Sequence, residues 1–126
     1  MILLTGATSD PGREVVRLLK QTDTAFKIFT RNETRAKTIL GHDIECIQGN
    51  FNDRDSMFAA LEGVETLFLN TPRSENELII NMQFIEAAGK QNVKRIVKLS
   101  LPINALNPEI RAQWEAAHVA FQIEET

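Results

Sequence analysis

Residues 1–13 read MILLTGATSDPGR, and this stretch decides how the rest of the chain is organised. Residues 2–4 form an apolar run that is too short for a helix and is typical of a buried parallel strand. Gly6, Ser9 and Gly12 then recur at intervals of three, and a helical pattern follows. Small residues let the backbone approach a ligand, and a helix N-terminus offers unpaired N–H groups and the positive end of its dipole. The stretch therefore predicts a binding site for an anion such as phosphate.

The remainder of the chain alternates strands with helices. Further strands are predicted over residues 25–30, 43–48, 66–69 and 94–99, and further helices over residues 32–40, 53–61, 75–91 and from 107 to the chain end. This alternation predicts one α/β domain over residues 1–126, built as a doubly wound parallel sheet with strand order 3-2-1-4-5. Ligands bind such sheets beyond the C-terminal strand ends, where the order reverses between the first and fourth strands.

Apolar spacing also predicts which faces of two helices point into the core, and local signals predict where helices begin and end. Asn32 and Asp53 are expected as N-caps and Gly41 as a helix end. The residues expected to face inward are Met57, Phe58 and Leu61 in the helix over 53–61, and Leu78, Met82 and Ile85 in the helix over 75–91.

Composition excludes several classes of protein. The chain is 43% hydrophobic and 25% charged with a net charge of −3, which is typical of a globular domain and argues against nucleic acid as a partner. Cys46 is the single cysteine and lies among apolar residues, so it is expected to be a buried structural thiol in a cytoplasmic protein. No apolar stretch reaches the length of a membrane span.

The opening turn resembles the T-G-A-T-G-x-x-G turn of short-chain dehydrogenases, particularly their NmrA-like branch of NAD(P)-binding proteins. The resemblance covers essentially all 126 residues and implies a Rossmann-like fold whose first turn binds the pyrophosphate of a dinucleotide. The residues that would form this turn are Gly6, Thr8, Ser9, Asp10, Pro11 and Gly12. The alternative is a glycine turn that only packs a helix on the sheet.

Two residues of this turn do not fully suit a phosphate site: one departs from the family pattern, and the other carries a negative charge. Ser9 stands in the place of the middle glycine, where it either crowds the pyrophosphate or donates a hydrogen bond to it. Asp10 is a good N-cap with Pro11 at the next position, but its charge opposes phosphate.

The end of the second strand indicates which dinucleotide is bound. An acidic residue there would bind the ribose 2′-hydroxyl of NAD, whereas an arginine accommodates the 2′-phosphate of NADP. The chain has Arg31 at this point, with Arg35 and Lys37 nearby. We therefore predict NADP, with NAD less favoured. The alternative is a solvated helix start whose charges bind nothing specific.

Two further loops resemble cofactor-contacting segments of the family. Residues 49–53, GNFND, resemble the G-D-x-x-D stretch whose first acid approaches the adenine, and here Asn50 and Phe51 follow the glycine. An amide can still bond to adenine, because it donates and accepts hydrogen bonds. The loop that resembles the segment near the nicotinamide ribose consists of Asn70, Thr71, Pro72 and Arg73.

Catalytic residues are harder to assign, because the chain contains no tyrosine. The Tyr-x-x-x-Lys dyad of short-chain dehydrogenases is therefore absent. Ser100 resembles the family serine by its place after the fifth strand, Lys98 lies two residues before it, and His118 on the last predicted helix is a further candidate proton carrier. Each also has a purely structural explanation. No metal site is expected.

Two classes of function remain open. The first is an NAD(P)H-dependent oxidoreductase acting on a quinone or other carbonyl-like substrate, as the resemblance implies. The second is a non-catalytic module that senses the redox state of NADP. Family members continue into a C-terminal substrate region that this chain is expected to lack. Family members also have another strand after the fifth. Without a sixth strand, the fifth would be a sheet edge, which predicts self-association.

Overall fold

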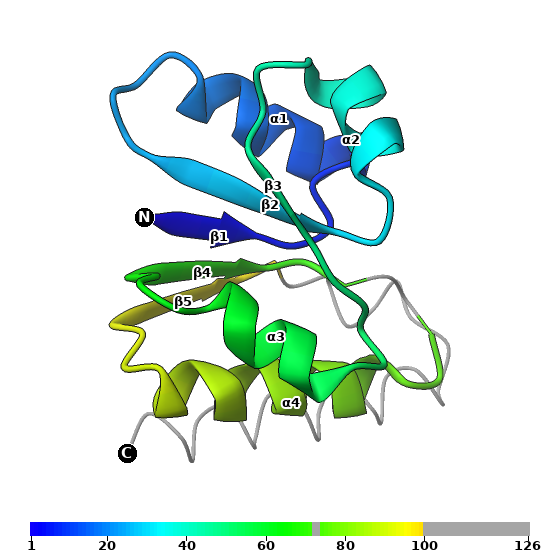
Figure 1. Cartoon of the computed structure of the whole chain (residues 1–126), viewed down its shortest axis with the longest axis vertical. Coiled ribbons are helices and arrows are strands. Elements are labelled where there is room, and N and C mark those ends of the chain that lie inside the picture. The colour runs from blue at the N-terminus through cyan, green and yellow to red at the C-terminus, as the bar shows by residue number, and fades with distance from the viewer. Residues whose placement is uncertain (72–73, 100–126) are drawn as a thin grey trace, which may run out of the picture.

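The computed structural model describes residues 1–71 and 74–99, in which helices cover both faces of a five-stranded parallel sheet (Figure 1). The strands are β1 (Ile2–Leu4), β2 (Phe26–Thr30), β3 (Cys46–Gln48), β4 (Thr66–Leu69) and β5 (Arg95–Lys98). The helices are α1 (Asp10–Leu19), α2 (Glu33–Leu40), α3 (Arg54–Ala60) and α4 (Glu77–Lys90). The sheet order β3-β2-β1-β4-β5 confirms the predicted fold. The helix predicted from residue 107 lies outside the described residues.

The strands β1 and β2 each supply side chains to two separate hydrophobic cores, one on each face of the sheet. Leu3 and Phe29 pack with α3 and α4, whereas their neighbours Leu4 and Ile28 pack with α1 and α2. All four side chains are buried. Successive residues of a strand point to opposite faces, so a strand covered on both faces is apolar at every position. Figure 1 shows the two helical layers on opposite sides of the sheet.

The inward face of α3 is largely as predicted, with one error. Met57 and Leu61 are fully buried, but the Phe58 side chain is 43% exposed. Phe58 follows Met57 directly, so it lies about 100° further round the helix and points away from the sheet.

The predicted face of α4 is wrong at Met82 and only partly right at Leu78. Ile85 is buried, but Met82 is 49% exposed and Leu78 is only partly buried. The buried face consists of Glu77, Ile80, Asn81, Phe84, Ile85, Ala87 and Ala88. Apolar residues surround most of α4, so their spacing could not select a face. The edge-on contact of Phe84 with Phe29, with ring centroids 5.3 Å apart, orients the helix.

Local signals predicted the ends of α2 correctly, and the strand after it proved shorter than expected. The Asn32 side chain caps α2 by accepting the N–H of Arg35, and Gly41 ends the helix with φ +113°. Residues 42 and 43 form a turn, and β3 begins only at Cys46. The Cys46 thiol is half-buried, and burial raises its pKa, as does the Glu33 carboxylate to a smaller extent.

Two glycines permit the tight packing of the first turn. Gly6 has φ +62°, and a Cβ there would lie 2.0 Å from the carbonyl oxygen of Asn70. A Cβ on Gly12 would lie 2.2 Å from the Gly6 carbonyl oxygen and 2.7 Å from Cα of Ala7. The start of α1 therefore packs directly against the backbone of the turn after β1.

These contacts predict opposite effects of the same substitution in two helices. Gly12→Ala forces backbone atoms apart and should lower the free energy of unfolding by about 1–3 kcal/mol. Gly89→Ala, in α4, meets no atom within 4 Å and should raise it by about 0.5–1 kcal/mol through its helix propensity. Urea denaturation followed by circular dichroism measures both. Equal effects in the two variants would contradict the packing described for Gly12.

Candidate functional site

The turn after β1 and the end of β4 are joined at the point where the strand order reverses. Thr5 is fully buried; its hydroxyl accepts the N–H of Asn70 at 2.8 Å and donates to the Asn70 carbonyl oxygen at 3.2 Å. The Thr5 N–H also donates to the carbonyl oxygen of Phe68 at 3.0 Å. In open α/β sheets this switch point is where ligands bind.

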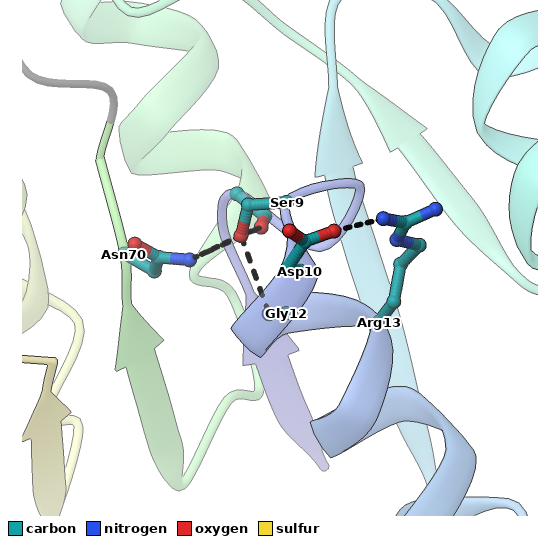
Figure 2. Close-up of polar contacts among 6 residues, drawn as sticks. Ser9, Asp10, Gly12, Arg13 and Asn70 are labelled. Carbon is teal, nitrogen blue, oxygen red and sulfur yellow. Dashed lines mark hydrogen bonds and ion pairs between the residues drawn. The ribbon is translucent and has the colours of Figure 1, made fainter.

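Ser9 is the N-cap of α1. Its hydroxyl accepts the N–H of Gly12 at 3.2 Å and donates to the Gly6 carbonyl oxygen at 2.8 Å. The side-chain amide of Asn70 donates to the same hydroxyl at 2.8 Å, which Figure 2 shows as a bridge from β4 to the start of α1. The prediction that Asp10 caps the helix is wrong. The extended backbone and short side chain of Ser9 place its hydroxyl oxygen within reach of the Gly12 N–H, so Ser9 is the cap.

Asp10 is the first residue of α1, and Pro11 is the second. The Asp10 carboxylate pairs with the Arg13 guanidinium one turn later, and Figure 2 shows both side chains on the side of the helix away from Asn70. Both side chains are exposed. The negative charge at the N-terminal end of α1 is thus partly balanced within the helix itself.

A pocket lies beside this turn, between β1, β2 and α2. Its lining residues are Gly6, Ala7, Thr8, Ile28, Phe29, Thr30, Arg31, Asn32, Arg35, Ala36 and Phe51. The structure therefore brings four of the predicted residues, Gly6, Thr8, Arg31 and Phe51, around one cavity. Arg35 joins them, whereas Lys37 pairs with Glu33 at 3.1 Å instead.

Local hydrogen bonds, formed between residues two or three positions apart, hold the segment that carries the two arginines. The Thr30 hydroxyl accepts the N–H of Asn32 at 3.1 Å, and the Asn32 side chain accepts the N–H of Arg35 at 3.0 Å. β2 therefore passes into α2 through a single tight connection. Both guanidinium groups are carried on this connection and on the first turn of α2, next to the pocket.

Phe51 forms one wall of the pocket and is held by two other rings. Its centroid lies 5.6 Å from that of Phe29 and 5.8 Å from that of Phe84. The half-buried ring thus connects the pocket to the core beneath α3 and α4.

Asn50 does not line this pocket, and its side-chain oxygen accepts the N–H of Asn52 at 2.9 Å within its own turn. Asp53 caps α3 as predicted, accepting the N–H groups of Asp55 and Ser56. A contact between Asn50 and adenine stays a prediction.

A second polar group lies at the C-terminal ends of β4 and β5. The Thr71 hydroxyl lies 3.0 Å from Oδ1 of Asn81 and 3.4 Å from Oε1 of Glu77. Glu77 and Asn81 are 7% and 2% exposed, and Lys98 is half-buried. Burial lowers the pKa of Lys98, and the Glu77 carboxylate opposes this by raising it.

Sequence reasoning missed Glu77 and Asn81. The available signal was their spacing, because two polar residues four positions apart lie on one face of a helix, and the other residues of that buried face are apolar. Of the other predicted residues, Pro72, Arg73, Ser100 and His118 lie outside the described residues, so the proximity of Lys98 to Ser100 stays a prediction. Within residues 1–71 and 74–99, no three acidic, histidine or cysteine side chains are arranged to hold a metal ion, and no helix is long and apolar enough to cross a membrane.

Comparison with known proteins identifies the family. Residues 1–121 match the model of the NmrA-like family. The chain belongs to the NmrA-like family. It is 32% identical over 97 residues to NAD(P)H azoreductase of Xenophilus azovorans, covering 77% of this chain and 34% of that protein. It is 35% identical over 104 residues to quinone oxidoreductase 2 of Escherichia coli (strain K12), covering 80% of this chain and 36% of that protein.

Solved structures of similar proteins share the fold of this NmrA-like chain. The NADPH complex of an NADPH-dependent quinone oxidoreductase from Escherichia coli superposes with a TM-score of 0.84 at 26% identity, covering 98% of this chain and 45% of that one. Triphenylmethane reductase from Citrobacter sp., complexed with NADP(H), gives a TM-score of 0.83 at 23% identity, covering 98% and 46%. This NmrA-like chain spans about a third of the length of the curated relatives it matches.

The electrostatic interaction between Glu77 and Lys98, at the C-terminal ends of β4 and β5, leads to a prediction about titration. Glu77→Gln removes the charge that raises the pKa of Lys98, so that pKa should fall further below its usual value. The titration of the Lys98 side chain followed by NMR measures this shift. Glu86→Gln removes an exposed carboxylate that pairs with Arg54 and Lys90, and should leave the pKa of Lys98 unchanged. A Lys98 pKa that rises in Glu77→Gln would contradict the coupling.

Proposed function

We propose that the chain binds NADP(H) across the C-terminal edge of its sheet. In this proposal the pyrophosphate lies over the turn of residues 6–12, and the adenosine with its 2′-phosphate occupies the pocket beside Arg31 and Arg35. The observation that carries the proposal is the pocket itself, whose lining joins the glycine turn to both guanidinium groups. The NADP(H) complexes of the solved relatives support it.

The charge of the pocket favours NADP over NAD. None of the described residues that line it is acidic, so the carboxylate that would bind the 2′-hydroxyl of NAD is absent from this lining. Two guanidinium groups supply several donors to phosphate oxygens, and such charge-assisted bonds are stronger than those to a neutral hydroxyl. The nearby Glu33 carboxylate pairs with Lys37.

For the whole protein we propose NAD(P)H-dependent reduction of a quinone or another carbonyl-like compound. The names of two relatives, NAD(P)H azoreductase and quinone oxidoreductase 2, support this class. The cofactor supplies the hydride when it is bound. Lys98, at the end of the sheet where Thr71 and Glu77 lie, is our candidate for holding or moving a proton. Ser100 and His118, which lie outside the described residues, stay candidates for the same role.

A specific observation favours a second function, in which the chain senses NADP without turnover. The 126 residues contain no tyrosine, so the acid–base dyad of short-chain dehydrogenases is missing. A calorimetric titration with NADPH, run beside NADPH oxidation assays with quinones, azo dyes and aldehydes, separates the two functions. Binding with turnover supports the reductase, and binding without turnover supports the sensor.

Removing one guanidinium group should change the preference between cofactors. Arg31→Ala should weaken NADPH binding roughly 10- to 100-fold, because a charge-assisted hydrogen bond to the 2′-phosphate is lost. NADH affinity should stay the same, since NADH lacks that phosphate. Arg95→Ala removes an exposed arginine at the far edge of the sheet and serves as the control. Calorimetry provides all six dissociation constants, and equal losses for NADPH and NADH in Arg31→Ala would contradict the assignment.

We also propose that this protein is cytoplasmic. We propose, as a separate point, that it self-associates through β5. Among the described residues β5 pairs with β4 alone, and Val97 is 46% exposed. Free N–H and C=O groups of an edge strand pair readily with another chain. Size-exclusion chromatography with light scattering should give the mass of two chains at micromolar concentration, and Val97→Lys should shift it toward one chain. A monomer at every concentration would contradict the proposal.

A further inference from the structure

The Ser9 hydroxyl has no remaining capacity for a ligand. A serine hydroxyl has one proton to donate and two lone pairs to accept with. In Ser9 the proton goes to the Gly6 carbonyl oxygen, and the lone pairs receive the Gly12 N–H and the Asn70 amide. A phosphate can therefore bond to this hydroxyl only if one of the three bonds opens.

The Asn70 amide crosses the switch point between β1 and β4. The backbone of Asn70 is held by the buried Thr5, and its Nδ2 reaches both Ser9 Oγ at 2.8 Å and the Gly6 carbonyl oxygen at 3.2 Å. Figure 2 shows this amide pointing from β4 toward the start of α1. The side chain thus lies over the edge of the sheet where ligands of such folds are bound.

The first amides of α1 are already largely satisfied without an anion. Pro11 has no N–H, the Gly12 N–H is taken by the Ser9 hydroxyl, and the Arg13 N–H donates to the Ser9 carbonyl oxygen at 2.8 Å. A helix N-terminus binds an anion through such amides. A pyrophosphate that bonds to the Gly12 N–H must therefore compete with Ser9 for it.

We propose that Ser9 and Asn70 determine the affinity for the dinucleotide by forming a polar latch, defined as the Asn70 Nδ2 to Ser9 Oγ hydrogen bond. The inference rests on the proposed binding of NADP(H). In the closed latch, Ser9 occupies the Gly12 N–H and the Asn70 amide. When Ser9 Oγ releases these two donors, both become available to a phosphate oxygen. Ser9 is exposed, so the exchange needs no rearrangement of the core.

The latch predicts that removing a hydrogen-bonding group tightens binding. Ser9→Ala keeps the Cβ but removes the competing hydroxyl, and Ser9→Gly removes both. Each should lower the dissociation constant for NADPH roughly three- to tenfold, the range that one net hydrogen bond contributes. Each should also lower the melting temperature, because α1 loses its N-cap. A purely structural role of Ser9 would lower the melting temperature without tightening binding.

The chain offers a matched control at the other end of the same helix. The Thr22 hydroxyl donates to the Leu19 carbonyl oxygen at 2.8 Å and accepts the N–H of Thr24 at 3.2 Å. Thr22→Ala therefore also removes a hydroxyl with backbone hydrogen bonds, but far from the turn. It should leave the NADPH dissociation constant at the wild-type value.

Calorimetric titration of the full chain with NADPH, at one salt concentration, distinguishes the latch from the proposed function. Tighter binding by both Ser9 variants, or binding by these variants alone, supports the latch. Equal or weaker binding by both variants, with wild-type binding intact, overturns the latch and leaves the proposed function standing. Tighter binding by Ser9→Gly alone indicates crowding by the Cβ and also overturns the latch. No binding by any variant overturns the proposed function, and the latch with it.

Discussion

The close approach of the first turn to the end of β4 is the constraint on which the rest of the structure depends. Gly6 has φ +62° and leaves no room for a Cβ against the Asn70 carbonyl oxygen, while the buried Thr5 hydroxyl holds the Asn70 backbone. These contacts join the two halves of the sheet where the strand order reverses. As a result, the start of α1 and the loops after the neighbouring strands lie along one edge.

The polar and charged side chains along this edge of the sheet form two regions. On one side, Arg31 and Arg35 line a pocket that contains no acidic residue among the described ones, which suits a phosphate-bearing nucleoside. On the other side, Thr71, Glu77 and Lys98 lie at the ends of β4 and β5, where burial shifts a lysine pKa downward. The Ser9–Asn70 hydrogen bond lies between the two regions, so a ligand that extends across the edge passes over it.

Predictions from the sequence succeeded where a feature depends on a few neighbouring residues. Asn32 and Asp53 cap their helices as predicted, because an N-cap bond is formed within two or three residues. The prediction failed for α1, where Ser9 and Asp10 are both good caps. The choice between them is reinforced by Asn70, which is 61 positions from Ser9 and reaches its hydroxyl only in the folded chain.

The sequence by itself determined the order of strands and helices, the parallel sheet and the resemblance to NmrA-like proteins, because apolar spacing and turn residues act over short distances. Only the tertiary structure decided which face of α4 is buried and which hydrogen bonds the Ser9 hydroxyl makes. It also decided that Glu77 and Asn81 lie buried beside Thr71. These properties depend on contacts between separate elements, and no local pattern contains them.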